Sequence, residues 1–187
     1  MNRPVNWIAN RNSNPPTPTL TAGHLPRCPA FFISMKPYTP HEFKVMQVRE
    51  CEPMTELLAE PDQVALYWRQ NILQADWYDP MKEAFVVLVL NTRKCIIGHN
   101  LVALGSLDSC PVVPLSVFRP VIVAAGNSIV LIHNHPSGIP SPSEADIKVT
   151  RDLIRAGQLL KIEVVDHIIM ASGGEYLSLK ALGYFWQ

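Results

Sequence analysis

The stretch from Ile129 to Asp146 constrains this chain more than any other. An apolar run that starts at Ile129 ends in two histidines one residue apart, His133 and His135. A loop rich in Pro, Gly and Ser follows, and then a helix start that carries Asp146. Residues i and i+2 of a strand point to the same face, so both imidazoles can approach one point. The stretch therefore predicts a strand, a return loop and a helix, in this order.

Two imidazoles and one carboxylate are typical ligands of catalytic zinc. Pro136 biases His135 towards an extended backbone, and three prolines stiffen the loop 136–142 that returns the chain to Asp146. Three protein ligands leave a fourth position for water, whose pKa falls to about 7 when zinc binds it. The sequence thus predicts one zinc ion held by His133, His135 and Asp146.

A hydrolytic zinc site also needs groups that move protons and stabilise charge. Glu83 opens an apolar strand in a water-poor environment and is the best candidate for the general base. Ser143 is placed to donate to an oxyanion, although its spacing from Asp146 favours a capping box by about two to one. The alternative interpretation of Glu83 is a surface carboxylate at the end of a strand, without a catalytic role. For Asp166-His167 we favour an imidazole satisfied inside the core over a contact with the site or its substrate.

Strands and helices alternate along the rest of the chain. Strands are predicted over residues 42–51, 83–91, 94–104, 128–132, 162–170 and 176–179, and helices over 61–74, 113–125 and 143–158, the last ending near Gly157. The continuous apolar run 84–90 indicates a strand that is buried on both faces. Interleaved strands and helices predict the α/β fold class with a central sheet. Active sites of such sheets gather where strands end, which is where His133 lies.

Residues 1–40 form a proline-rich arm that we expect to be poorly ordered, because eight of the 17 prolines lie there. The arm has four basic residues and no acidic one, whereas residues 41–187 hold 12 basic and 16 acidic residues. A net charge of −4 in this larger part is a poor match for DNA phosphates, so DNA is an unsupported partner. Met35 offers an alternative start of translation.

The cysteines point to a reducing compartment. Cys28, Cys51, Cys95 and Cys110 show no C-x-x-C spacing, and the chain start has no signal-peptide pattern. We therefore predict reduced thiols in a cytoplasmic protein. The longest apolar run is far too short to span a bilayer, so no membrane partner is expected. The sequence leaves the oligomeric state open.

The motif residues resemble a known family. His133-x-His135 followed by seven residues, Ser143, two residues and Asp146, with Glu83 upstream, is similar to the JAMM signature of JAB1/MPN+ metalloproteases. Further similarity to the RadC family lies in the string His133-Asn134-His135-Pro136-Ser137-Gly138, in residues 140–146, 153–162 and 166–169, and in Val117-Phe118-Arg119. The resemblance covers roughly residues 80–180.

The resemblance implies a three-layer α/β/α domain of the cytidine-deaminase-like (JAB/MPN) type with a mixed central sheet. We place this domain at residues 80–182, after a strand and helix in residues 41–79. The resemblance also implies one zinc ion on the histidine and aspartate ligands, with Glu83 as the catalytic glutamate. The reaction it implies is hydrolysis of a peptide or isopeptide bond in a peptide or protein substrate.

The RadC resemblance carries a second function as well. RadC-type proteins bear a DNA-repair label, so the alternative is a DNA-repair-associated accessory protein whose zinc site is structural or vestigial. RadC proteins resemble one another in an N-terminal helix-hairpin-helix region, and no matching G-x-G hairpin occurs before residue 80. This departure weakens the DNA-binding inference for the present chain.

Overall fold

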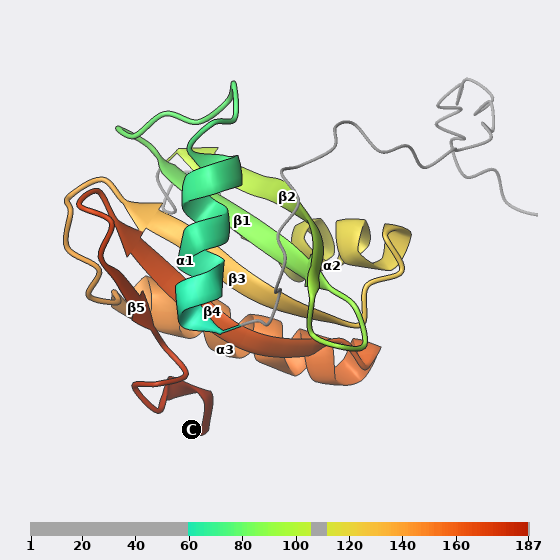
Figure 1. Cartoon of the computed structure of the whole chain (residues 1–187). Coiled ribbons are helices and arrows are strands. Elements are labelled where there is room, and N and C mark those ends of the chain that lie inside the picture. Colours follow the sequence, from blue (N-terminus) through green and yellow to red (C-terminus); the bar gives the residue numbers. More distant parts are fainter. Residues whose placement is uncertain (1–59, 106–111, 187) are drawn as a thin grey trace, which may run out of the picture. The chain divides into compact units, whose positions relative to one another are not determined.

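The computed structural model describes residues 60–105 and 112–186, and the structural statements below refer to these ranges. They form a five-stranded sheet with helices on both faces (Figure 1). The strands are β1 (Glu83–Leu90), β2 (Ile96–Gly105), β3 (Ser128–His135), β4 (Glu163–Ala171) and β5 (Tyr176–Ser178). The helices are α1 (Pro61–Tyr67), continued by the π-helical turn η1 (Trp68–Ile72), α2 (Pro114–Val123), α3 (Glu144–Leu160) and the 3-10 turn η2 (Tyr184–Trp186).

The sheet is mixed, as predicted. Its strand order is β2-β1-β3-β4-β5, and among the described strands β3 and β4 are the parallel pair. The other neighbours run antiparallel. Helix α1 lies on one face of the sheet, and α2 and α3 lie on the other (Figure 1). This arrangement confirms the predicted α/β class with a central sheet between helical layers.

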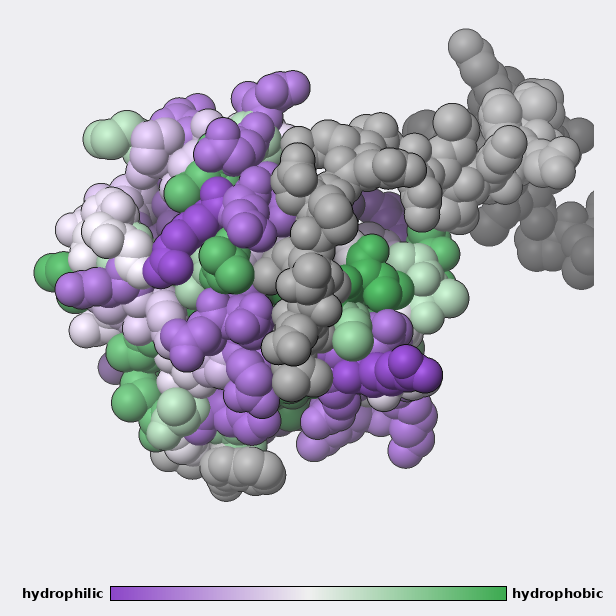
Figure 2. Space-filling view, viewed as in Figure 1, coloured by the Kyte–Doolittle hydropathy of each residue, from purple (hydrophilic) through white to green (hydrophobic). Residues whose placement is uncertain are grey.

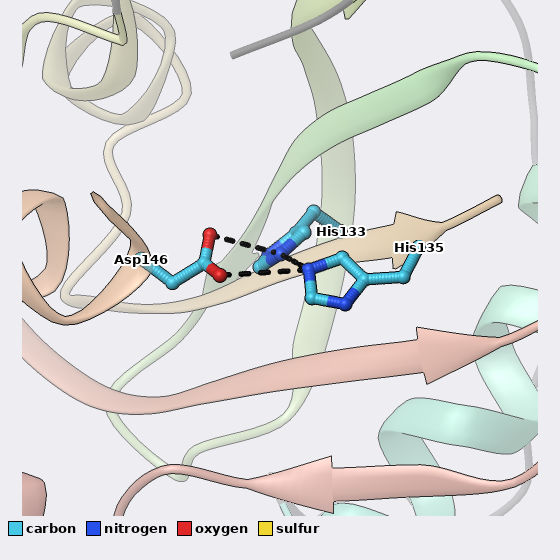
Figure 3. Close-up of side chains that lie close together, drawn as sticks. All are labelled: His133, His135 and Asp146. Carbon is cyan, nitrogen blue, oxygen red and sulfur yellow. Dashed lines mark hydrogen bonds and ion pairs between the residues drawn. The ribbon is translucent and has the colours of Figure 1, made fainter. Parts of the chain in front are cut away.

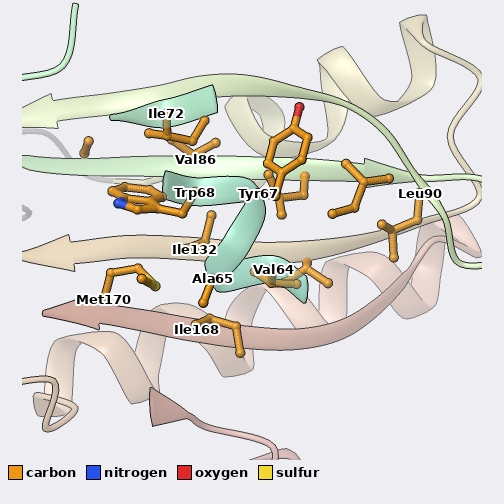
Figure 4. Packing of buried hydrophobic residues seen from close by; sticks show 14 residues of the cluster. Val64, Ala65, Tyr67, Trp68, Ile72, Val86, Leu90, Ile132, Ile168 and Met170 are labelled. Atoms are coloured by element: carbon orange, nitrogen blue, oxygen red, sulfur yellow. The ribbon is translucent and has the colours of Figure 1, made fainter. Parts of the chain in front are cut away.

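Strand β1 explains how one apolar run serves both faces. Its even-numbered side chains, such as Val86 and Leu88, enter a cluster with residues of α1 and η1 (Figure 4). Its odd-numbered side chains, such as Phe85 and Val87, enter a second cluster with residues of α2 and α3. Because side chains alternate along a strand, a strand buried on both faces is apolar throughout. Each such side chain stabilises the fold by about 1.5–3 kcal/mol.

Two predicted element ends differ from the structure. Strand β3 continues three residues beyond Ile132, because His133 to His135 pair with Ile169 to Ala171 of β4. Helix α3 does not end at Gly157 but runs to Leu160, and Lys161 takes the left-handed conformation that ends it. Gly157 has a packing role instead, since a Cβ atom there would lie 2.4 Å from the carbonyl oxygen of Ile162.

Several sequence predictions fall outside the described residues. They are the proline-rich arm 1–40 and the strand 42–51. The predicted domain boundaries at residues 40 and 79 stay predictions. In the part of the chain that is described, no helix is long and apolar enough to cross a membrane. Hydrophobic residues are interspersed with hydrophilic ones on the face shown in Figure 2.

Candidate metal centre

The two histidines of the motif meet at the end of β3. Both lie on the sheet face that α3 covers, because Ile129 and Leu131 on the same side of β3 belong to the cluster of that face. Their Nε2 atoms are 3.0 Å apart. His133 is fully buried, whereas 13% of the His135 side chain is exposed. The pair therefore has one protected and one accessible member.

Asp146 completes the group from the first turn of α3 (Figure 3). Its Oδ1 lies 3.2 Å from Nε2 of His133, and its Oδ2 lies 3.5 Å from Nε2 of His135. The loop between strand and helix is tightly turned at Gly138, whose φ of +78° favours glycine. A Cβ atom at Gly138 would also lie 2.9 Å from Oγ of Ser172. The loop thus returns Asp146 to the histidines, as predicted.

The geometry of these three side chains fits one metal ion. The distances of 3.0, 3.2 and 3.5 Å between their ligand atoms resemble the edge of about 3.3 Å that a tetrahedron has when each ligand is about 2.0–2.1 Å from its centre. Oδ1 of Asp146 is buried and accepts no hydrogen bond. Such an oxygen is costly unless a cation or donor faces it. The residues present therefore suit a divalent cation of the zinc type.

Electrostatics keep the Asp146 carboxylate ionised and make the site attractive to positive charge. Burial alone would raise the pKa of Asp146, but its contacts with the imidazoles of His133 and His135 hold that pKa well below its usual range. The Asp146 carboxylate in turn raises the pKa of His135, and the charge of Glu83 adds to this effect. The negative charge that favours a proton on His135 also favours a metal cation, which must displace that proton in order to bind the imidazole.

A hydrogen bond selects the ligand nitrogen of His135. Its Nδ1 lies 2.8 Å from the carbonyl oxygen of Ile139, which only accepts hydrogen bonds. Nδ1 therefore carries the proton, and in the neutral ring Nε2 keeps its lone pair and faces the site. Orientation of a ligand histidine by a backbone carbonyl is common at metal sites.

Glu83 lies at the edge of this group. Strands β1 and β3 are antiparallel with Phe85 opposite His133, so Glu83, two residues earlier, extends the same face towards His135. Phe85 itself stacks on the His133 ring with centroids 5.8 Å apart. The contribution of Glu83 to the pKa of His135 agrees with this placement. The structure thus places Glu83 beside the two histidines and Asp146 without assigning it a role.

Asn134 fixes the backbone on both sides of Glu83. It points to the opposite face from the histidines and is 4% exposed. Its Oδ1 accepts a hydrogen bond of 2.8 Å from the amide of Ala84, and its Nδ2 donates one of 3.0 Å to the carbonyl of Lys82. Asn134 therefore fixes the backbone at the start of β1 and, with it, the position of Glu83.

Replacing Asn134 by Ala is expected to lower the free energy of unfolding by about 1–3 kcal/mol, because the buried amide of Ala84 loses its acceptor. Urea unfolding at equilibrium measures the loss. Asn100→Ala on β2 is the matched control, since Asn100 is exposed. A loss no larger than that of the control would show that the clamp contributes nothing to stability.

Ser143 forms a capping box with Asp146. Its Oγ accepts from the amide of Asp146 at 3.1 Å, and its own amide donates to Oδ2 of Asp146 at 2.8 Å. The hydroxyl proton also points to Oδ2, at 2.6 Å. The favoured structural interpretation is therefore confirmed. The oxyanion role stays a prediction, and it requires the hydroxyl to leave Oδ2.

His167 is both a hydrogen-bonded core imidazole and a neighbour of the metal site. The ring is fully buried, and burial followed by the charge of His133 lowers its pKa well below the usual range. Its Nε2 is 2.8 Å from Nδ1 of His133, and its Nδ1 is 2.6 Å from Oγ1 of Thr150. His167 is thus a satisfied core imidazole that also contacts the site. Thr150 was not among the predicted site residues, although it lies one helical turn after Asp146.

Asp166 points away from the site. Its carboxylate accepts hydrogen bonds from the hydroxyl of Ser178 at 2.6 Å and from the amides of His167 and Lys180 at 2.7 and 3.1 Å. Burial raises its pKa. Asp166 therefore ties β4 to the end of β5 and does not belong to the metal centre.

The histidine pair, the aspartate and the mixed sheet together define a JAB-type α/β domain. A family model described as the RadC-like JAB domain matches residues 58–184. The chain belongs to this family.

Curated relatives agree with this assignment. The chain is 42% identical to the UPF0758 protein TTE0897 of Caldanaerobacter subterraneus subsp. tengcongensis over 115 residues, which are 62% of the chain and 49% of that relative. It is 38% identical to a UPF0758 protein of Methanosarcina acetivorans over 133 residues, 71% of the chain and 55% of the relative. It is 37% identical to the UPF0758 protein ABC2615 of Shouchella clausii over 137 residues, 73% and 57% respectively. The chain thus spans about half the length of the curated relatives it matches.

Proposed function

We propose that this chain is a zinc-dependent hydrolase that cleaves a peptide or isopeptide bond. The observation that carries the proposal is the approach of His133, His135 and Asp146 to one point beside Glu83. Three ligands with a fourth open position are typical of catalytic zinc, whereas structural zinc has four protein ligands. The proposal names zinc because imidazole and carboxylate ligands at near-tetrahedral spacing suit it.

The chemistry follows from the residues around the ligands. When bound, zinc would polarise the scissile carbonyl group and lower the pKa of a water molecule to about 7. Glu83 accepts a proton from the attacking water and then donates it to the leaving nitrogen. The C–O bond forms, the C–N bond breaks, and the products are a carboxylate and an amine. Buried His133 anchors one side of the site, while partly exposed His135 lies on the side that a substrate can reach.

The alternative is a DNA-repair-associated accessory protein with a structural or vestigial zinc site. It has less support, because a structural site has no use for a fourth open position next to a glutamate. The net charge of −4 outside residues 1–40 also gives little attraction for DNA phosphates. The cytoplasmic location and a peptide or protein substrate belong to the same proposal as the hydrolase.

Metal analysis and a cleavage assay test the proposal together. The purified full chain is expected to contain about one zinc ion per chain and to cleave members of a peptide and isopeptide library. A chelator should remove both the metal and the activity, and added zinc should restore both. Protein that binds zinc at full stoichiometry but cleaves nothing, while showing steeply salt-dependent DNA binding, would favour the accessory function instead.

A further inference from the structure

A chain of hydrogen bonds connects two of the proposed ligands through the interior. It begins at the backbone carbonyl of Asp146, which lies 2.5 Å from Oγ1 of Thr150. It continues from Oγ1 of Thr150 to Nδ1 of His167 at 2.6 Å, and from Nε2 of His167 to Nδ1 of His133 at 2.8 Å. Thr150 and His167 are at most 1% exposed, so water does not compete for these bonds.

Donors and acceptors can be assigned to these three hydrogen bonds in only one consistent way. A carbonyl oxygen only accepts, so the single hydroxyl proton of Thr150 goes to Asp146. Oγ1 of Thr150 must then accept the proton of Nδ1 of His167. A neutral imidazole with a proton on Nδ1 has a lone pair on Nε2, so His167 accepts from Nδ1 of His133. The reverse direction would leave two oxygens 2.5 Å apart with no proton between them.

We infer that Thr150 and His167 are positioning residues that hold His133 in the tautomer with its proton on Nδ1 and its Nε2 lone pair towards a divalent cation. The inference rests on the proposed function for the identity of the ligands. It also explains why the two ligand nitrogens are equivalent. The carbonyl of Ile139 makes Nε2 the ligand atom of His135, and the hydrogen bonds through Thr150 and His167 make Nε2 the ligand atom of His133.

These hydrogen bonds also couple the positions of Asp146 and His133. Thr150 binds the carbonyl of Asp146 one turn earlier in α3, so the helix backbone that carries Asp146 sets the position of the hydroxyl. His167 relays this position to His133 across the sheet. Partners of ligand histidines commonly change metal affinity by about 10–100-fold when they are removed. A residue that only fills space would not have this effect if its shape were kept.

A pair of substitutions at Thr150 in the full chain separates hydrogen bonding from packing. Thr150→Val keeps the shape and removes the hydroxyl, whereas Thr150→Ser keeps the hydroxyl. Competition with a chromophoric chelator gives the Kd for Zn²⁺. Thr150→Val is expected to bind Zn²⁺ about 10–100-fold more weakly than the wild type, and Thr150→Ser is expected to remain close to it.

Imidazole ¹⁵N–¹H correlation spectra of the metal-free protein give the second readout, because they report which nitrogen of His133 carries the proton. The wild type and Thr150→Ser should show it on Nδ1, and Thr150→Val should show a mixture. Equal Zn²⁺ affinity of Thr150→Val and the wild type, or a wild-type proton on Nε2 of His133, would overturn the inference. If the wild type binds no Zn²⁺, the proposed function fails while the spectrum still decides the tautomer. If Thr150→Val does not fold, the wild-type spectrum alone still decides which nitrogen of His133 carries the proton.

Discussion

The Glu83→Gln variant is expected to keep its zinc and to lose hydrolysis, with kcat/KM lowered by about 10²–10⁴-fold. Glutamine has nearly the same shape as glutamate but cannot accept the proton of the attacking water. The loss should appear in kcat with little change in KM, since proton transfer matters in the transition state and not in substrate binding. Initial rates on a cleaved library peptide, together with zinc content, measure the effect.

Two features allow a substitution at Glu83 to test proton transfer alone. The backbone on both sides of it is held by Asn134, so the substitution should not move the start of β1. None of the three ligand atoms belongs to Glu83, so the zinc affinity should stay near that of the wild type. Glu175→Gln is the matched control, because Glu175 is exposed on the turn between β4 and β5. A Glu83→Gln variant that cleaves as fast as this control would exclude Glu83 as the general base.

The local pattern was sufficient to predict the ligand group. An H-x-H pair in a strand places both imidazoles on one face whatever the rest of the fold does. The S-x-x-D spacing likewise predicts the capping box, because only residues of one helix turn take part in it. The apolar run of β1 predicts burial on two faces for the same local reason. These features depend on spacing within single elements, and a sequence contains that spacing directly.

The positions of His167 and Asp166 depend on strand register and could not be read from the sequence. Strand β4 pairs with β3 through an irregularity, after which Val130 lies opposite Asp166 and Leu131 opposite His167. Without it, His167 would lie on the other face of the sheet, and Asp166 would take its place beside the ligands. One extra residue in β4 therefore decides which side chain contacts His133.

The second large effect is expected for His135→Ala, which should abolish the stabilisation of the fold by zinc. For the wild type, free zinc at about 1,000 times its Kd adds about 4 kcal/mol to the free energy of unfolding. In a protein of this size, 1 kcal/mol corresponds to about 2–4 °C in Tm. The wild type should therefore melt roughly 8–16 °C higher with zinc than without it, and the variant should show no zinc-dependent shift.

His135 is the best ligand for this experiment because its loss disturbs the metal-free fold least. It is the partly exposed member of the group, whereas His133 and Asp146 are buried at the core of the site. Its Nδ1 proton bonds a loop carbonyl at Ile139, not a strand or a helix. His99→Ala is the control, since His99 pairs with the hydroxyl of Tyr67 and lies outside the ligand group. Because two ligands cannot hold zinc as three do, a full zinc shift in His135→Ala would mean that the metal binds elsewhere in the chain.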